Sequence, residues 1–394
     1  MPFNLKGISF KRFLIITLGI ISMLSMGTIY SWSVFRIPLE KEMGITTALS
    51  GLPFLVFLAL YSFSMPFAGK LIEKYKPSTV AVAGSIVLSL SYLLSGFCSS
   101  IYQLVLTYGI IGGIGVGILY GVPVAMASRW FPNSKGIATG ATLLGFGLSP
   151  LLTAPIASFL IENYGVNNTF KILGLVFLTF LPAIAMFFKN PVDYSQSNSK
   201  VTVVENELEI IKDRRFILLW LLFFIVAFSG LMTISISSPF SQHILDISHT
   251  DAAIILSLFA FFNGFGRLIF GVLIDKAGLH KVMNVSFLLL IVTSLSIATL
   301  VPKSSLQFVI SMSVVWGVFG GWLTIVPISV IQFFGRRNSS KNYGILFTAY
   351  GFGAIAGVTL ASKAKEFTGG YQSVFYVVFT MSILGFIIIR KMLN

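Results

Sequence analysis

Long apolar runs separated by short polar gaps follow one another along almost the whole chain. A helix needs roughly 20 mostly apolar residues to cross a bilayer, and runs of about that length recur twelve times. The pattern predicts an all-α membrane protein with twelve transmembrane helices, near residues 13–35, 50–72, 79–98, 101–128, 136–161, 169–188, 216–242, 252–274, 282–301, 305–334, 342–362 and 371–389.

The longest polar stretch covers residues 190–215 and separates six predicted helices from the next six. We therefore expect an N-terminal bundle over residues 1–189, a cytoplasmic linker, and a C-terminal bundle over residues 216–394. Val204, Leu208 and Ile211 fall at helical spacing within the linker, which indicates either a short helix lying along the membrane surface or a flexible connection.

Composition and charge support the membrane assignment. Hydrophobic residues make up 56% of the chain and charged residues only 10%, whereas a soluble domain has about 25% charged residues. The net charge of +14 comes from Lys and Arg in the polar gaps, so it indicates topology and not a nucleic-acid surface. Twenty of these residues lie on the face that holds both termini, against six on the other face, which predicts cytoplasmic termini in the cell (plasma) membrane.

The two halves repeat each other. Gly69-Lys70-Leu71-Ile72-Glu73-Lys74 recurs 202 residues later as Gly271-Val272-Leu273-Ile274-Asp275-Lys276, and Gly145-Phe146-Gly147 recurs 206 residues later as Gly351-Phe352-Gly353. Parallel repeats of six helices, with a binding site at their interface, are typical of transporters that work by rocking of two halves. Glycines four residues apart, such as Gly136 and Gly140, favour close helix packing.

Arg267 is the one Lys, Arg, Asp or Glu placed deep within an apolar run, between Ala252 and Ile274. A charge at bilayer depth costs roughly 2.5–3.5 kcal/mol on insertion scales, so such a residue usually faces a cavity and has a function. Its planar fork can hold both oxygens of a carboxylate. The alternatives are snorkelling, although Asp275 marks the span end about 12 Å away, or binding to backbone carbonyls.

Several motifs carry a resemblance to a known family. The repeated loops at Gly69 and Gly271 resemble the signature of the major facilitator superfamily. Four further stretches together resemble its oxalate/formate antiporter group and the related monocarboxylate transporters: Tyr30-Ser-Trp-Ser-Val-Phe35, Tyr120-Gly-Val-Pro123 to Trp130-Phe131-Pro132, Gly136-Ile-Ala-Thr-Gly140 and Asn263-Gly-Phe-Gly-Arg267. The resemblance covers the whole chain and implies two pseudo-symmetric six-helix bundles. It also implies that Arg267 binds the carboxylate of the substrate.

The chain departs from this group at three positions. Tyr350, after Phe347-Thr348-Ala349, occupies the place where the oxalate carriers have a lysine. A dianion facing Arg267 alone would keep an unpaired charge in a medium of low dielectric, so we expect a monocarboxylate of the lactate, pyruvate or formate type. Tyr30 and Asn263 occupy the places of the proton-coupling lysine and aspartate of the animal carriers. Proton-linked transport is our expectation by analogy with the family, and exchange remains open.

Other residues are candidates for the same site. Asn263, one helical turn before Arg267, is expected to orient the guanidinium or bind the substrate, or only to join two helices. The hydroxyls of Tyr30, Tyr120 and Tyr350 are candidate donors to the carboxylate. Candidates for an apolar wall are Phe319, Trp322 and Phe347, and packing is the alternative for all these aromatic residues.

Glu73 and Asp275 end their spans on the predicted cytoplasmic side. The family signature implies a gating role for them, in which they pair with basic residues or helix N-termini of the opposite half. The alternative is that they are solvated loop charges.

Other function classes find little support in the sequence. The single Cys98 excludes a disulfide framework, and His243, His249 and His280 have no spacing typical of metal ligands. No grouping of catalytic residues is present, so we predict neither an enzyme nor a cofactor, and we expect a monomer. We predict a secondary transporter of small organic anions, with an oxalate/formate-type antiporter and a carboxylate sensor that does not transport as alternatives.

Overall fold

The computed structural model describes residues 10–191, 207–247, 249–300, 305–336, 338–368 and 370–393, and these contain helices and no strands. The first half of the chain forms α1 (Phe10–Met26), the 3-10 segment η2 (Gly27–Ser31), α2 (Trp32–Met43), α3 (Thr47–Ser50), α4 (Leu52–Lys74), α5 (Pro77–Ser95), α6 (Ile101–Leu104), the π-helical segment η3 (Val105–Gly112), α7 (Gly113–Trp130) and α8 (Lys135–Ala185). The second forms α9 (Glu207–Lys212), α10 (Arg214–Leu245), α11 (His249–Ala277), α12 (Leu279–Ala298), α13 (Ser305–Phe334), α14 (Ser339–Thr368) and α15 (Ser373–Leu393).

Eleven of the described helical segments are long and apolar enough to cross a membrane, and one of them makes two crossings. Helix α8 has 51 residues, which would span roughly 75 Å if straight, more than twice the hydrocarbon thickness of about 30 Å. Gly165 interrupts it with a φ of 78° and a ψ of 167°, values that a helix does not adopt. The described chain therefore makes the twelve crossings that the sequence predicts, but the gap expected near residues 162–168 is a bend and not a loop.

The first crossing extends further than its apolar run. The sequence predicts an end near Phe35, whereas helical structure continues through η2 and α2 to Met43. Hydrogen bonds to Ser50 in α3 hold this extension in place, because the Trp32 indole donates to the Ser50 carbonyl at 2.9 Å and the Arg36 Nε donates to the Ser50 hydroxyl at 3.0 Å. The helix therefore continues past the apolar run because Ser50 binds the side chains of Trp32 and Arg36.

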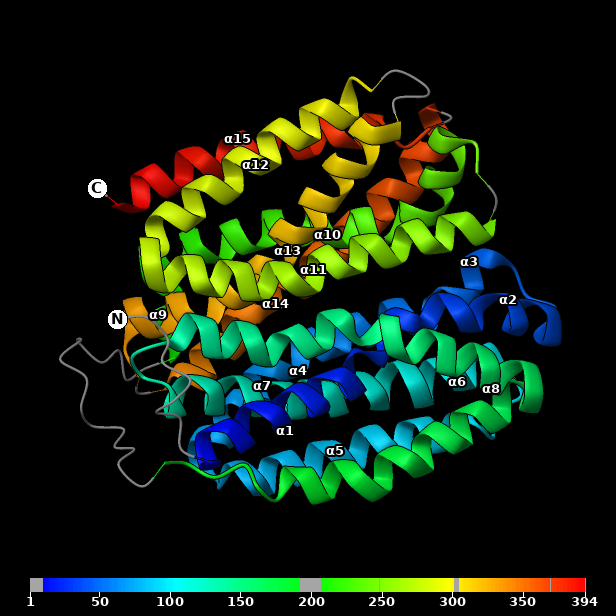
Figure 1. The fold of residues 1–394 in the computed structure, drawn as a ribbon, viewed down its shortest axis with the longest axis horizontal. Helices are drawn as coiled ribbons and strands as arrows, with labels where there is room; N and C mark the ends of the chain where they lie inside the picture. Colours follow the sequence, from blue (N-terminus) through cyan, green and yellow to red (C-terminus); the bar gives the residue numbers. More distant parts are fainter. Residues whose placement is uncertain are drawn as a thin grey trace.

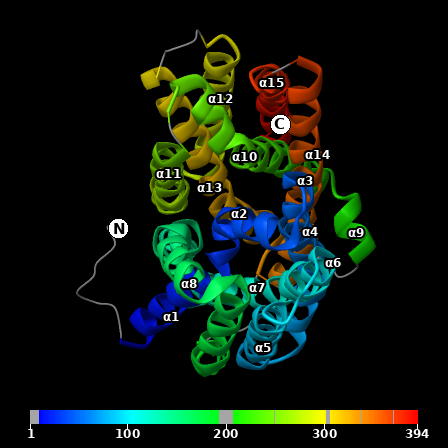
Figure 2. The ribbon, with the colours of Figure 1, turned by 90° about the vertical axis from the view of Figure 1, so that its right-hand side faces the viewer.

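The helices form two groups that lie side by side (Figures 1 and 2). Helices α1–α8 form one group, here called the N-terminal half, and α10–α15 form the other, the C-terminal half. The chain begins and ends at the same end of the molecule, on the left in Figure 1, which we call the termini end. Helices α2 and α3 lie at the opposite end.

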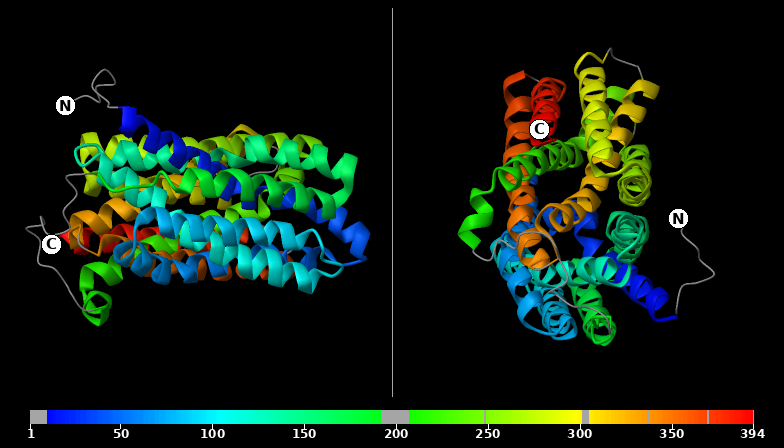
Figure 3. Two further views of the ribbon diagram at one scale, coloured as in Figure 1. Left: turned by 90° about the horizontal axis from the view of Figure 1, so that it is seen from below. Right: turned by 90° about the vertical axis from the view of Figure 1, so that its left-hand side faces the viewer.

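The linker expected to contain a surface helix is described only in part. Val204 and the side chain of Leu208 lie outside the described residues, whereas α9 covers Glu207–Lys212. Ile210 in this helix is buried and Ile211 is exposed. Figure 3 shows α9 projecting from the bundle at the termini end.

The two halves meet mainly along two seams, where α8 packs against α11 and α4 packs against α14. Glycines set both seams. A Cβ on Gly136 would collide with the carbonyl of Gly271, and a Cβ on Gly271 would collide with that of Gly136. Gly69 and Gly344 approach the facing backbone equally closely on the other seam. The halves therefore touch backbone to backbone towards the termini end, as small residues at helix interfaces permit.

Candidate anion-binding site

Arg267 on α11 is completely buried. Its Nη1 donates a hydrogen bond to the carbonyl of Leu143 on α8 at 3.1 Å, and its Nη2 donates to the Oδ1 of Asn263 at 3.1 Å. The guanidinium carbon lies 5.3 Å from the centre of the Phe146 ring. Within the described ranges no carboxylate pairs with this charge, so Arg267 is a buried cation held by neutral groups.

One donor of the guanidinium is unpaired. The Nε of Arg267 has no hydrogen-bond partner among the described residues. A Cβ built on Gly147 would lie 3.1 Å from this Nε and 2.6 Å from the Cα of Gly264. Gly147 therefore lets the backbone of α8 pack closely against Gly264 and the Arg267 Nε. This Nε has no partner in a part of the protein where a missing hydrogen bond is costly.

Asn263 holds the arginine and joins two helices at the same time. Its Oδ1 accepts from Arg267, while its Nδ2 donates to the carbonyl of Trp316 on α13 at 3.1 Å. The spacing of four residues places both side chains on one face of α11. The second hydrogen bond fixes the amide, so Asn263 contacts Arg267 and also joins α11 to α13.

The candidate tyrosines come together from both halves. The hydroxyls of Tyr30, in η2, and Tyr350, on α14, are hydrogen-bonded at 2.9 Å across the interface. Tyr120 on α7 is buried, and its hydroxyl has no partner among the described residues. The rings of Tyr30 and Tyr120 both pack on Phe146, the ring that contacts Arg267. The three tyrosines therefore bring groups that can donate to an anion into the cluster around the arginine.

Two of the three candidate wall residues belong to the same cluster. Phe347 stacks on Tyr350 with ring centres 4.9 Å apart and lies 5.7 Å from Tyr120, while Phe319 stacks on Tyr350 at 6.1 Å. Trp322 is different, because its indole donates to the Ser286 hydroxyl on α12 at 2.8 Å. That contact lies inside the C-terminal half, and the indole ring also packs on Phe287 at 5.6 Å, so Trp322 makes the packing contacts that were the alternative for it.

The structure adds residues that the sequence reasoning did not assign to the site. Phe146 contacts Arg267 and lies 5.1 Å from Tyr30 and 5.5 Å from Tyr120, ring centre to ring centre. The ring of Tyr61 on α4 lies 5.1 Å from that of Phe347. Phe146 carried a usable signal, since it is the centre of the repeated Gly-Phe-Gly triplet. Tyr61 carried none.

A cavity of about 250 Å³ lies between the halves, on the side of the cluster away from the termini. Its inner residues include Tyr30, Gly147 and Asn263, and Trp32 and Arg36 line it nearer the opposite end. Since a water molecule takes up about 30 Å³ of liquid, the volume is enough for a small carboxylate with some hydration. The cavity reaches the residues that surround Arg267.

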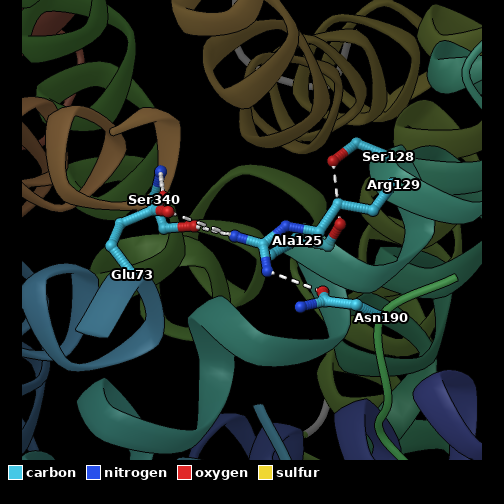
Figure 4. A network of polar contacts seen from close by, with 6 residues as sticks. All are labelled: Glu73, Ala125, Ser128, Arg129, Asn190 and Ser340. Carbon is cyan, nitrogen blue, oxygen red and sulfur yellow. Dashed lines mark hydrogen bonds and ion pairs between the residues drawn. The ribbon is translucent and has the colours of Figure 1, made fainter. Parts of the chain in front are cut away.

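The termini end of the interface is closed by polar contacts (Figure 4). Glu73, at the end of α4, accepts a hydrogen bond from the backbone N–H of Ser340 at 2.9 Å and lies 3.5 Å from the Arg129 Nη2. Arg129 also donates to the Asn190 Oδ1 at 2.9 Å and to the Ser340 hydroxyl at 3.3 Å. A carboxylate of the N-terminal half thus caps the start of α14 in the C-terminal half, where the helix dipole favours negative charge.

Asp275 makes the corresponding contact on the other seam. Its two carboxylate oxygens accept the backbone N–H groups of Gly136 at 3.1 Å and Ile137 at 2.8 Å, at the start of α8. Each half therefore places one carboxylate on a helix N-terminus of the other half. Both residues make the kind of contact that a gating role requires.

Comparisons with known proteins agree with this architecture. The family model described as Major Facilitator Superfamily matches residues 15–358. The chain is 28% identical to the "Oxalate:formate antiporter" of Oxalobacter formigenes over 95% of this chain and 89% of that protein. It is 23% identical to "Monocarboxylate transporter 12" of Homo sapiens over 77% of this chain and 66% of that protein.

Solved structures show the same fold. The proton:xylose symporter XylE superposes with a TM-score of 0.77 at 15% identity, covering 96% of this chain and 95% of that one. The transporter FucP, described in the outward conformation, gives a TM-score of 0.75 at 14% identity, covering 95% of this chain and 98% of that one. The match over most of the chain, together with twelve crossings in two repeated halves, makes this protein a multi-pass membrane transporter of the Major Facilitator Superfamily.

Proposed function

We propose that this chain carries small monocarboxylates of the lactate, pyruvate or formate type, by alternating access and linked to protons. The observation that supports the proposal is Arg267, a buried cation with no acidic partner in the described residues and with an unpaired Nε. A carboxylate supplies the missing negative charge and the missing acceptor together. We further propose that the protein acts as a monomer in the plasma membrane with both termini in the cytoplasm.

Charge balance favours a monoanion. Arg267 neutralises one negative charge, whereas the second charge of oxalate would face Tyr350 and Tyr30, whose hydroxyls are hydrogen-bonded to each other. An uncompensated charge in a site of low dielectric is strongly unfavourable. The similarity to a protein named an oxalate:formate antiporter makes oxalate/formate-type exchange the alternative.

The positions of the closing contacts and of the cavity support alternating access. The seams and the carboxylates of Glu73 and Asp275 close the termini end, and the 250 Å³ cavity lies on the other side of Arg267. Rocking of the halves would break the first set of contacts and close the cavity. Closing the empty site would leave a dry cation, so we expect substrate to speed the return step.

A substrate panel tests this proposal. Purified protein in liposomes is given labelled lactate, pyruvate, formate and oxalate, with and without a pH gradient, and with and without internal substrate. We expect uptake of the monocarboxylates to rise when the inside is alkaline, because a co-transported proton then moves down its gradient. Transport of oxalate alone would contradict the monoanion assignment, and stimulation only by internal substrate would replace proton linkage by exchange.

Gly147→Ala is expected to raise the dissociation constant for lactate at least about tenfold, because the added methyl group would lie 3.1 Å from the Arg267 Nε and 2.6 Å from the Cα of Gly264 and would displace this donor. Isothermal titration of the purified variant measures this constant. Gly140→Ala is the matched control: its methyl group disturbs the same α8–α11 seam, against the carbonyl of Arg267, but the atoms it meets do not include the Nε. Equal dissociation constants for the two variants would show that the edge beside Gly147 is not where the carboxylate binds.

A further inference from the structure

Two tyrosine hydroxyls lie buried without hydrogen-bond partners in the described chain, and one has no role in the site as described above. Tyr120, on α7, belongs to the N-terminal half, and Tyr343, on α14, belongs to the C-terminal half. Their side chains are 1% and 4% exposed. Both rings contact Phe347, with ring centres 5.7 Å and 5.5 Å away. Tyr120 and Tyr343 therefore pack on the same ring, one from each half of the molecule.

A buried hydroxyl without a partner is unfavourable, and native proteins usually satisfy such groups or use them. Replacing either tyrosine by phenylalanine would fill the same space without this cost. Two such groups on one ring, in the cluster around a cation that also has an unpaired donor, point to an acceptor that reaches all three. None of the described residues forms a hydrogen bond with these donors in this closed arrangement.

The position of Tyr343 indicates in which state of the transporter this acceptor would bind. Tyr343 lines a second, small cavity of about 20 Å³, large enough for about one water molecule, together with Gly69, Ser128 and Ser340. Ser340 and Gly69 belong to the contacts that close the termini end. Tyr343 thus lies between the aromatic cluster around Arg267 and the closed end, on the path that opens when the α4–α14 seam separates.

Rigid-body geometry connects Tyr343 with Arg267. Both residues belong to the C-terminal half, so their separation is preserved while the halves rock, whereas Tyr120 moves away with the N-terminal half. Tyr343 packs on Phe347, which stacks on Tyr350 in the cluster around Arg267. An anion on Arg267 can therefore keep a contact with Tyr343 after the Tyr120 side of the site has withdrawn.

We infer, building on the proposed function, that Tyr343 binds the substrate carboxylate in the state open at the termini end. Tyr120 and Tyr343 together receive the carboxylate as the seam begins to part, and Tyr343 retains it until water enters. A neutral phenol holds an anion more weakly than a guanidinium does. Weaker binding at Tyr343 than at Arg267 would let the substrate bind there briefly and then dissociate.

The test is the Tyr343→Phe variant, assayed for exchange of labelled lactate, or of oxalate if the panel selects it. The protein is reconstituted in one orientation, with the termini end identified by a C-terminal tag. The half-saturation concentration is measured on each side while the other side is saturated. We expect an increase of about tenfold at the termini end, as for the loss of one hydrogen bond to a charged group, and a change of less than about twofold on the other side.

Tyr108→Phe is the matched control, because Tyr108 is also buried but packs on Trp32 and Phe57 in the N-terminal half. It should change neither concentration. Equal values for Tyr343→Phe and wild type on both sides would overturn the inference. So would an increase at the termini end matched by an equal decrease on the other side, since that result indicates a shift between states and not a lost contact. Absence of any carboxylate transport by the wild-type protein would instead reject the proposed function, and this inference with it.

Discussion

Arg267→Lys is expected to lower carboxylate uptake by about 100-fold or more while the protein still inserts into the membrane. Lysine keeps the charge but loses the planar fork. A single ammonium group cannot bind the Leu143 carbonyl, the Asn263 Oδ1 and the substrate with the geometry that the separate nitrogens of Arg267 provide. Disturbing one partner of a buried, hydrogen-bonded charge pair commonly costs 2–5 kcal/mol. Uptake of the preferred acid into liposomes, normalised to reconstituted protein, measures the effect.

The control for this experiment is Arg390→Lys. Arg390 is exposed near the end of α15, where its guanidinium lies over the ring of Phe386. This variant carries the same chemical change on the surface and should transport at the wild-type rate. Wild-type uptake by Arg267→Lys would remove Arg267 from the proposed site, because a carboxylate bound by the guanidinium should bind more weakly when the guanidinium is lost.

Glu73→Gln combined with Asp275→Asn is expected to open the termini end and to slow transport by about tenfold or more. The two carboxylates accept charge-assisted hydrogen bonds from helix N-termini of the opposite half, and the neutral amides lose the attraction to those helix dipoles. Each single variant should have a smaller effect, because the other seam stays capped. This double variant therefore tests whether the paired caps act as a gate.

The opening can be measured by spin labels on cysteines at Lys76 and Lys281, which are exposed near the termini end on opposite halves. We expect the double variant to show a longer and broader distribution of label distances than the parent protein. Glu42→Gln, an exposed carboxylate on α2 at the opposite end, is the matched control. An unchanged distance distribution in the double variant would mean that the glycine seams alone keep the termini end closed.

The sequence predicted the centre of the site because the centre carries a strong physical signal. A cation deep within an apolar run is rare and costly, so Arg267 could be recognised without coordinates. Asn263 followed from it, since four residues along a helix place two side chains on one face. The repeated loops likewise led to Glu73 and Asp275, and the structure places both on helix N-termini of the opposite half.

The aromatic part of the site was less accessible to sequence reasoning. The chain has 38 Phe residues, and their apolar side chains pack equally well against lipid, a helix or a ligand. Phe347 and Trp322 look alike in sequence, yet one lies beside Tyr350 and the other donates to Ser286. The Tyr30–Tyr350 hydrogen bond joins residues 320 positions apart, and no local pattern specifies such a pair.

Helix ends were the other weak point. The crossing count depends on hydrophobic length, which the sequence states directly, whereas the ends depend on local partners. The bonds from Trp32 and Arg36 to Ser50 extend the first crossing to Met43, and Gly165 turns an expected loop into a bend. These features depend on contacts that apolar periodicity does not encode.

The contact between Gly136 and Gly271 has a consequence for leakage. A barrier made of side chains can open for an instant when one rotamer flips, and water and ions can slip through. Here main chain touches main chain with no side chain in between, so the barrier opens only when a whole bundle tilts. We therefore expect slippage of protons and sodium to stay low even in a protein whose turnover is fast.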